Sequence, residues 1–351
     1  MNSLGPGFIE RQPIPQSLLQ TVRILGECKG KQQLFKEQAP QVLESLRLSA
    51  IIQSTEASNR IEGVVAASGR IREIVSMKSL PKNRSEQEIA GYRDVLKTIH
   101  SNYDSMDFTT GLVLQLHRDL YQFHPSVGGT RKSSDNAIEE TLSGGRKSIR
   151  FKPVPASLTP DAMERLHHRL NDLRNESMVE PLLLIPAYIL DFLCIHPFRD
   201  GNGRMARLLT LLLLYQSGYE VGRYISLEGM VEDNRDGYYD SLGESSRGWH
   251  ESTHSLLPWW GYFLGVMLLG AYREFGTRVG AVIQTHGAKR QMVIDFVLHQ
   301  QNPFRYADVE RACPVVSRPT INRALAELRK QGIIRCSKPG RDAVWEKRDH
   351  D

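Results

Sequence analysis

The chain has few cysteines, and none of them stands in a pair. The four cysteines of the 351 residues are Cys28, Cys194, Cys313 and Cys336, and no two of them form a CxxC motif. Such scattered spacing argues against a disulfide framework or a thiolate metal site and is typical of a reducing compartment.

Long uninterrupted apolar runs are missing as well. The most apolar stretch, residues 181–198, contains Pro186 and Asp191 and runs into His196, so it falls short of the roughly 20 apolar residues that a membrane span requires. The N-terminal residues do not show a basic segment followed by an apolar one, so secretion is not expected. We predict a cytoplasmic protein with no membrane partner, in which residues 181–198 form a buried helix.

Internal repeats, low-complexity tracts and a strong charge bias are also lacking. Hydrophobic residues make up 40% and charged residues 24% of the chain, which is ordinary for a soluble globular protein. The net charge of +5 permits an acidic partner without requiring one. The length is sufficient for two or three domains with at least one buried core.

Helical patterns dominate what is present. Apolar residues recur at helical spacing in residues 39–63, which end in the helix-terminating Gly63, and in residues 109–123. Residues 85–103 open with a Ser-x-x-Glu pattern that predicts a capping box, and residues 159–175 open with Thr-Pro, a helix start signal. Glycine and proline interrupt residues 126–155, which predicts an irregular or hairpin segment there.

A separate small unit is predicted from about His286 onward. Three short amphipathic segments are followed by two strand-like ones: residues 288–300, 305–313, 317–332, 333–338 and 343–348. Three helices and a two-stranded wing predict a winged helix-turn-helix. Its third helix carries four basic residues that could reach DNA, Arg318, Arg323, Arg329 and Lys330, but Glu327 interrupts them. The partner of this unit, DNA or another protein, stays open.

The densest polar chemistry lies in "HPFRDGNGRMAR", residues 196–207, between two apolar stretches. Its glycines allow a tight turn that exposes successive N–H groups, and a helix begins directly afterwards. Free N–H groups at the positive end of a helix dipole form an anion site. Arg204 and Arg207 share one face of that helix and can bind further phosphate oxygens.

Two other groups complete this segment. Asp200 supplies a hard oxygen ligand suited to Mg²⁺ bound to phosphates. His196 can take up a proton near neutral pH. An anion site, a metal ligand and a base together predict phosphoryl or nucleotidyl transfer.

Residues 196–207 resemble the signature of the Fic family, His-x-Phe-x-(Asp/Glu)-Gly-Asn-Gly-Arg-x-x-Arg, at every specified position. Most members transfer AMP from ATP to a hydroxyl side chain (Tyr, Thr or Ser) of a target protein. The resemblance implies that His196 deprotonates that hydroxyl, that Asp200 holds Mg²⁺ and that Phe198 anchors the loop. It also implies that ATP phosphates are bound by Gly201, Asn202, Gly203, Arg204 and Arg207.

The similarity extends over roughly residues 40–270. "RKSSDNAIEE" followed by "IRFKPVP" is similar to the family's flap, a hairpin that docks the target main chain; its docking residues would be Asn136, Ala137, Ile138 and Glu139. Glu139 and Glu140 replace the usual glycines, and an extra "TLSGGRKS" follows, which bears on target specificity rather than on chemistry. Residues 234–242 are similar to the segment bordering the adenosine pocket, which makes Tyr238 and Tyr239 ATP-binding candidates.

"SNRIEG", residues 58–63, resembles the family's inhibitory motif, (Ser/Thr)-x-x-x-Glu-(Gly/Asn). The resemblance implies that Glu62 pairs with Arg207 and blocks the seat of the ATP γ-phosphate, since a carboxylate and a phosphate compete for one guanidinium. Ser58, one helical turn before Glu62, would help to hold it, and Gly63 completes the motif.

We therefore expect an all-α protein with a small β-hairpin flap: an N-terminal helical region (residues 1–105, with an inhibitory helix at about 42–63), a Fic catalytic core (106–285) and a winged helix-turn-helix (286–351). The expected activity is protein adenylyltransferase, with ATP, Mg²⁺ and target proteins; whether the chain also modifies itself stays open. Four alternatives stay open. They are removal of AMP from a modified target with Glu62 positioning water, transfer of another phosphate-containing group, DNA-binding regulation and homo-oligomerisation.

A rival pattern, "HESTH" at residues 250–254, fits the zinc-protease motif HExxH. That motif requires a regular helix, whereas here Gly248 precedes it, Pro258 follows it, and Ser252 and Thr253 are poor helix formers. We therefore do not expect a zinc hydrolase.

Overall fold

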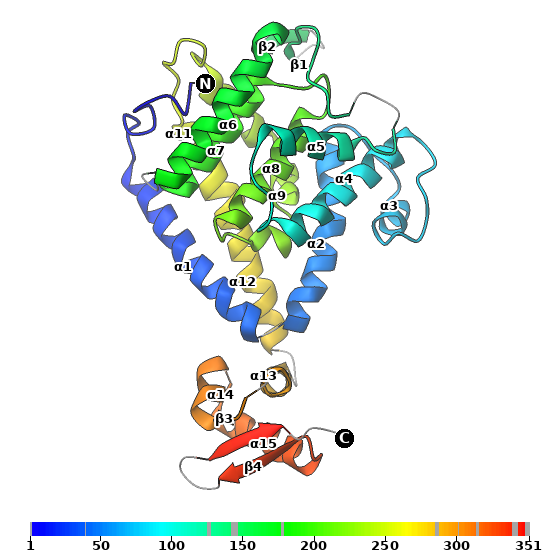
Figure 1. Cartoon of the computed structure of the whole chain (residues 1–351), viewed down its shortest axis with the longest axis vertical. Helices are drawn as coiled ribbons and strands as arrows, with labels where there is room; N and C mark the ends of the chain where they lie inside the picture. Colours follow the sequence, from blue (N-terminus) through cyan, green and yellow to red (C-terminus); the bar gives the residue numbers. More distant parts are fainter. Residues whose placement is uncertain are drawn as a thin grey trace. The chain divides into compact units, whose positions relative to one another are not determined.

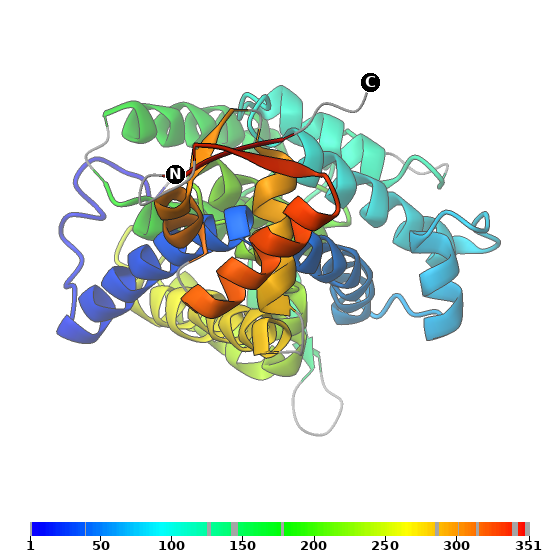
Figure 2. The ribbon, with the colours of Figure 1, turned by 90° about the horizontal axis from the view of Figure 1, so that it is seen from below.

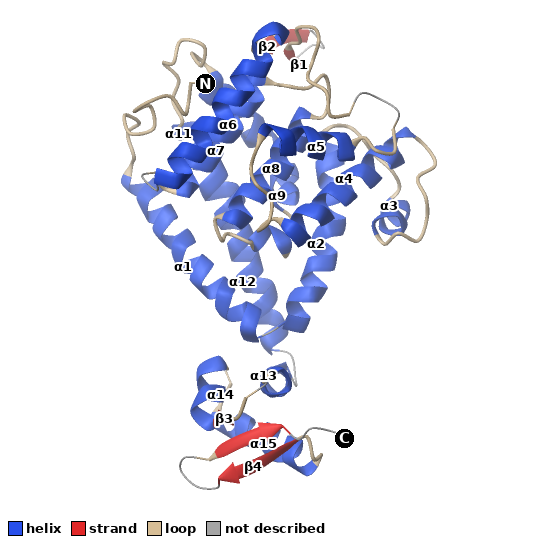
Figure 3. Ribbon diagram, in the orientation of Figure 1, coloured by secondary structure: helices blue, strands red, loops and turns tan. Residues whose placement is uncertain are grey.

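The computed structural model describes residues 2–38, 40–124, 128–141, 147–176, 179–284, 288–300, 302–313, 316–338 and 343–347. Helices make up most of the described chain, and strands occur in two small places (Figure 3). The mostly helical fold predicted from the sequence is thus confirmed.

The helices follow the chain in this order: α1 (Gln16–Gln38), α2 (Pro40–Ile61), α3 (Ser68–Val75), α4 (Arg84–Asn102), α5 (Thr110–Leu120), α6 (Thr159–Glu176), α7 (Pro181–Ile195), α8 (Asn202–Gln216), α9 (Leu227–Asp233), α10 (Arg235–Ser246), α11 (Leu257–Trp260), α12 (Leu269–Gln284), α13 (Ala288–His299), α14 (Tyr306–Ala312) and α15 (Arg318–Lys330). Short turns of 3-10 helix are η1 (Ala156–Leu158) and η2 (Val221–Arg223), and a π-helical segment, η3 (Gly261–Leu268), joins α11 to α12.

The chain divides into two compact units. The first comprises residues 1–26 and 48–272, and the second comprises residues 27–47 and 273–351. The long helices α1, α2 and α12 cross from one unit to the other. Every residue of the motif at 196–207 lies in the first unit.

The core of the first unit is built around α7 and α8, which pack against each other (Figure 1). Pro181 stands in the first turn of α7, where its missing N–H costs nothing, and almost every side chain of α7 and α8 is buried. A helix that is apolar on all sides is stable only when it is enclosed, and here α6 covers α7 while α4 covers α8. The predicted buried helix is therefore present, as α7.

The start of α4 differs from the prediction. Ser85 and Glu88 do not form the N-terminal cap, because the helix begins one residue earlier and Asn83 caps it by accepting the Glu86 N–H at 3.0 Å. Asparagine competes well with serine at this position, so the capping-box prediction was wrong by two residues.

A small hairpin stands at the edge of the first unit, beyond the helices (Figure 1 and Figure 2). Strands β1 (Ile138–Thr141) and β2 (Lys147–Phe151) are antiparallel, with Ile138 opposite Phe151 and Glu139 opposite Ile149. Most of the extra segment noted in the sequence, residues 142–146, lies outside the described residues.

The C-terminal part of the second unit contains α13, α14 and α15 with a three-stranded antiparallel sheet, which Figure 2 shows across the helices. The strands β3 (Phe304–Arg305), β4 (Ile334–Lys338) and β5 (Val344–Lys347) lie in the order β3-β5-β4. Strands β4 and β5 agree with the predicted two-stranded wing. The prediction that Arg305 begins a helix is wrong, because Phe304 and Arg305 pair with β5.

Within the described residues, no helix combines the length and the apolarity that crossing a membrane would require.

Candidate active site

The polar segment at residues 196–207 connects α7 to α8 and begins with an unusual backbone conformation. His196 caps the C-terminus of α7 with φ 52° and ψ 62°, and its N–H donates to the Phe192 carbonyl at 2.9 Å. A non-glycine residue in the left-handed region costs on the order of 1 to 2 kcal/mol and persists only where its surroundings hold it. The imidazole is therefore presented by a constrained backbone.

The hydrogen bond of the His196 ring fixes its tautomer. Nδ1 lies 3.2 Å from the Leu193 carbonyl, and because a carbonyl can only accept, Nδ1 carries the proton. Burial lowers the pKa of His196 to about 4, so the ring is neutral at physiological pH. Nε2 is left with a free lone pair, as a general base requires.

Asn202 and His117 contact the loop after His196. The Asn202 amide accepts the Phe198 N–H at 2.9 Å and donates to the Phe198 carbonyl at 2.8 Å. His117 stacks on the Phe198 ring with 3.6 Å between centroids and an angle of 3°. Phe198 is 1% exposed, in agreement with its expected anchoring place.

His117 also contacts the loop backbone. Its Nδ1 accepts the Gly129 N–H at 2.9 Å, so Nε2 carries the proton and donates to the Asp200 carbonyl at 3.1 Å. Burial lowers the pKa of His117 to about 4. Sequence reasoning missed this residue, since a lone histidine on α5 gives no signal of its distant partners.

The N-terminus of α8 has the backbone geometry of the anion cradle that the motif predicts; anion binding there stays a prediction. Gly201 adopts φ 81°, which lets the chain turn into α8, and the first helical bond runs from the Met205 N–H to the Gly201 carbonyl. The N–H groups of Asn202, Gly203 and Arg204 therefore have no partner within the helix. A Cβ at position 203 would collide with the Glu62 carboxylate, so only glycine fits here while Glu62 is in place.

The Arg204 guanidinium is held by side chains of the fold and lies 3.8 Å from the Asp200 carboxylate. It is 1% exposed, pairs with Glu88 at 2.7 Å and donates to the Tyr121 hydroxyl at 2.9 Å. Both contacts bind α8 to α4 and to the end of α5, and sequence reasoning did not identify either partner. Phosphate binding by the Arg204 side chain stays a prediction, whereas its backbone N–H belongs to the cradle.

The structure brings the residues of the expected inhibitory motif together with Arg207. The Arg207 Nη2 lies 2.7 Å from Glu62 Oε1, its Nε donates to the Ser58 hydroxyl at 2.9 Å, and Nη2 also donates to the Ser58 carbonyl at 3.0 Å. Arg207 is 6% exposed and Glu62 is 31% exposed. The carboxylate thus lies beside Gly203, at the mouth of the cradle.

Glu62 lies directly after the last residue of α2, where the backbone turns out of the helix. Gly63 takes φ 77°, and the Val64 N–H returns to the Asn59 carbonyl at 2.9 Å, which closes the helix. Arg235, at the start of α10, donates to the Ile61 carbonyl at 2.9 Å. This second contact with the end of α2 was not foreseen from the sequence.

The two tyrosines of α10 differ in exposure and surroundings. Tyr238 is buried among Trp259 and Tyr262, and burial raises its pKa to about 12. The Tyr239 ring faces two guanidinium groups, Arg150 at 5.8 Å and Arg235 at 5.7 Å. Tyr239 is thus half-buried beside two guanidinium groups, whereas Tyr238 is part of the core.

The residues of the expected flap precede and begin β1. Asn136 donates to the Phe198 carbonyl at 3.3 Å, which connects this segment to the motif loop. Ala137, Ile138 and Glu139 follow it, and Arg150 of β2 lies against Gly243 of α10. The side chain of Glu140 lies outside the described residues.

The Asp200 carboxylate is 61% exposed and accepts the Gly201 N–H at 2.6 Å. Among the described residues, no group of three histidines, cysteines or acids could hold a metal ion. One exposed carboxylate fits an Mg²⁺ ion that takes its other ligands from phosphates and water, so the donor set agrees with the expected metal.

The zinc-protease pattern does not form a metal site. Residues 250 and 251 lie in a turn, His250 Nε2 donates to the Lys152 carbonyl at 2.8 Å, and His254 contacts Ser3 at 2.9 Å. The two histidines thus serve separate packing contacts.

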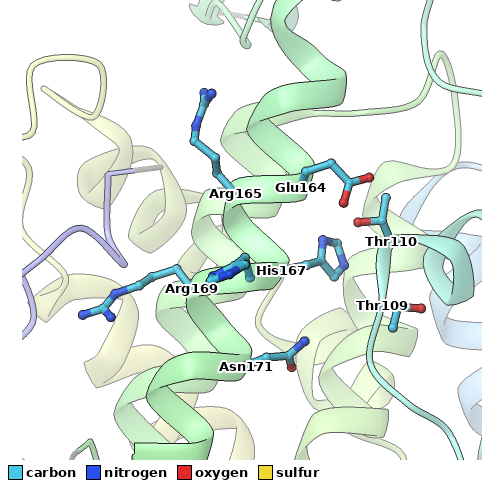
Figure 4. Close-up of a pocket in the computed structure, with 8 residues that line it drawn as sticks. Thr109, Thr110, Glu164, Arg165, His167, Arg169 and Asn171 are labelled. Atoms are coloured by element: carbon cyan, nitrogen blue, oxygen red, sulfur yellow. The ribbon is translucent and has the colours of Figure 1, made fainter.

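A pocket of about 510 Å³ lies between the start of α5 and α6 (Figure 4). It is lined by Thr109, Thr110, Glu164, Arg165, His167, His168, Arg169 and Asn171, none of which belongs to the motif. Figure 4 shows the Arg165 side chain extending away from Thr109 and Thr110.

Fold and site together define a helical protein that places a neutral histidine beside an anion cradle at a helix N-terminus. Residues 107–214 match the model of the Fic/DOC family. The chain therefore contains a Fic domain, as the sequence motif predicted.

Curated relatives agree with this assignment. The chain is 26% identical over 210 residues to the protein adenylyltransferase Fic of Nematostella vectensis, covering 57% of this chain and 44% of that protein. It is 28% identical over 137 residues to a probable protein adenylyltransferase of Aquifex aeolicus, covering 39% and 37%. The chain thus spans less than half the length of these relatives.

Solved structures share the fold. A Fic family protein from Desulfovibrio desulfuricans superposes with a TM-score of 0.62 at 20% identity, covering 97% of this chain and 98% of that one. Residues 134–508 of Fic-1 from C. elegans give a TM-score of 0.59 at 18% identity, covering 75% and 73%.

Proposed function

We propose that this chain is a protein adenylyltransferase that transfers AMP from ATP to a hydroxyl side chain (Tyr, Thr or Ser) of a target protein, and that Glu62 inhibits it by pairing with Arg207. The observation that carries the activity is the His196 Nε2 lone pair beside the free N–H groups at the start of α8. The relatives named as adenylyltransferases support the same chemistry.

In the proposed mechanism, the N–H groups of Asn202, Gly203 and Arg204 bind phosphate oxygens of ATP at the positive end of the α8 dipole. His196 Nε2 accepts the proton of the target hydroxyl while the hydroxyl oxygen bonds to the α-phosphorus. The bond from that phosphorus to the β-phosphate oxygen breaks, and pyrophosphate leaves. The negative charge of bound phosphates would raise the pKa of His196 toward neutrality and improve it as a base.

Asp200 is proposed to hold Mg²⁺ together with the phosphates. When bound, the ion neutralises charge that develops on the leaving pyrophosphate. Tyr239, whose face is flanked by two guanidinium groups, is the better candidate of the two tyrosines for contact with adenosine, because Tyr238 is enclosed.

The inhibitory role rests on the three contacts of Arg207. In this arrangement the guanidinium that would meet the γ-phosphate is occupied by Glu62 and Ser58. ATP could seat its γ-phosphate productively only after Glu62 withdraws.

The direct test is mass spectrometry of a cell lysate incubated with the protein and ATP. An added AMP on protein side chains, absent with His196→Ala, supports the proposal, and the modified residue names the target. No added AMP from either wild type or Glu62→Gly would refute it. Because Glu62 lies at the mouth of the cradle, release of AMP from a purified modified target should be assayed in parallel; release that requires Glu62 would assign the reverse activity.

For the C-terminal part, we propose a winged helix-turn-helix formed by α13–α15 and β3–β5. On α15 the side chains of Arg323, Arg329 and Lys330 are exposed, whereas Glu327 is engaged by Arg290. That arrangement reduces the negative charge on the helix face and supports binding to DNA. Binding to duplex DNA that weakens steeply as the salt concentration rises would support this function. If the protein does not bind duplex DNA at low salt, DNA binding is refuted and the partner of this unit is expected to be a protein.

A further inference from the structure

A buried lysine lies between α5 and the flap, beside the catalytic histidine. Lys132 is 6% exposed, which is rare for a lysine unless its ammonium is hydrogen-bonded. Its Nζ donates to the Ile195 carbonyl at 3.1 Å and to the Asn136 amide oxygen at 2.9 Å. Neither the family motif nor the composition draws attention to it.

The backbone of Lys132 makes a second contact on the other side of His196. Its N–H donates to the Pro197 carbonyl at 2.9 Å. One residue therefore holds the carbonyl groups immediately before and after His196, the residue in the left-handed conformation. Such a conformation persists only when neighbouring contacts fix it.

The same segment is anchored at both ends. Asn136, which accepts from Lys132, donates to the Phe198 carbonyl at 3.3 Å. The Asp135 carboxylate accepts the Ala156 N–H at 2.7 Å. Residues 132–136 thus connect the base of the flap to residues 195–198 of the motif.

The ammonium of Lys132 also affects the pKa of His196. The charged groups that act on His196 are Lys132, which lowers its pKa, and Glu62 and Asp200, which raise it. Burial lowers the pKa of Lys132 to about 8, so at pH 7 most of the ammonium stays charged.

We infer that Lys132 is a positioning residue for His196, holding the backbone on both sides of the histidine and keeping its Nε2 lone pair available for the target hydroxyl. The inference rests on the proposed function for the reaction that the histidine serves. The same segment that leads into the flap, residues 132–136, thus also orients the catalytic histidine.

The test compares Lys132→Met with a matched control, Lys97→Met. Lys97 is also partly buried, and its Nζ also donates to a backbone carbonyl, that of Val75 at 3.0 Å, but on α4. We expect Lys132→Met to lower kcat by about 10- to 100-fold, since small misplacements of a catalytic group cost this much. The KM for ATP should change less than twofold, because no Lys132 contact involves the cradle, and Lys97→Met should leave both constants unchanged.

A second measurement does not depend on AMP transfer. In protein labelled with ¹⁵N-histidine, the ring nitrogens of His196 report its tautomer and its titration. We expect a neutral ring protonated at Nδ1 in the wild type, and in Lys132→Met a titration midpoint higher by about one pH unit, because a nearby positive charge is lost. The titration of His117 should stay unchanged.

Lys132→Gln covers the case in which the methionine variant does not fold, since it keeps a donor but not the charge; it should show the same rise in the His196 midpoint and a smaller loss of kcat. An unchanged His196 titration in folded Lys132→Met or Lys132→Gln would overturn the inference. A loss of activity in Lys132→Met that is matched by an equal loss in the control Lys97→Met, or that only reflects a smaller amount of folded protein, would overturn it as well. If no variant or wild type transfers AMP, the proposed function fails while the titration still decides the role of Lys132.

Discussion

The contact between Glu62 and Arg207 makes a quantitative prediction for Glu62→Gly. The Oε1–Nη2 distance is 2.7 Å, the guanidinium is almost enclosed, and the carboxylate is about two-thirds covered. The substitution removes the carboxylate but leaves the Ser58 contacts of Arg207 in place. Arg207 then becomes available to the γ-phosphate.

The size of the effect follows from the bond that ATP must displace. A charge-assisted hydrogen bond contributes about 1.5 to 3 kcal/mol, and about 1.4 kcal/mol corresponds to a factor of ten in an equilibrium. Loss of Glu62 should therefore raise the fraction of productively seated ATP, and the rate of AMP transfer, by about 10- to 100-fold. Glu62→Gln, which keeps the shape and one acceptor but loses the charge, should give a smaller increase.

Self-modification with ATP labelled at the α-phosphate measures this directly. Glu56→Gln is the matched control: Glu56 lies on the same helix and pairs with Arg60 at the surface, so labelling should stay at the wild-type level. Arg207→Ala should not increase labelling, because ATP needs that guanidinium. Equal labelling of wild type and Glu62→Gly would remove the inhibitory helix from this account and leave the transfer chemistry standing.

Four further outcomes are expected. His196→Ala should abolish transfer while ATP binding, followed by calorimetry, stays within about twofold, since the base acts on the hydroxyl and not on the nucleotide; transfer at the wild-type rate would contradict the mechanism. Asp200→Ala should remove Mg²⁺-dependent activity, and tight Mg²⁺ binding to the nucleotide-free protein that survives the substitution would count against this ligand. Arg235→Ala removes the bond to the Ile61 carbonyl and should raise self-modification severalfold by loosening the end of α2; a decrease together with weaker ATP binding would instead assign Arg235 to the nucleotide. Burial lowers the pKa values of His117 and His196 to about 4, below the usual 6.5 of an unfolded histidine, so between these two pH values the unfolded chain binds more protons than the folded one. As the pH is lowered from 6.5 to 4, chemical denaturation should therefore show the free energy of unfolding decreasing by on the order of 2 kcal/mol per histidine. A free energy of unfolding that does not change over this pH range would refute the burial argument.

The helical fold, the buried helix before the motif and the Fic domain can be predicted from the order of amino acids alone. These features depend on local patterns: an apolar stretch that needs enclosure, and a contiguous run from His196 to Arg207 in which each residue type and spacing is specified. The sequence also predicted the pairing of Glu62 with Arg207, but only through the resemblance, since no local rule joins residues that are 145 positions apart.

The surroundings of these residues depend on how the chain folds in space. Arg204 has the same chemistry as Arg207 in the sequence, yet α4 and Tyr121 enclose its guanidinium, whereas Arg207 meets Ser58 and Glu62. His117, Lys132 and Asn136 acquire their roles because the fold places them against a loop more than 60 residues away. A hydrogen bond or a shifted pKa depends on distance and burial in space, and neither quantity is written in the order of residues along the chain.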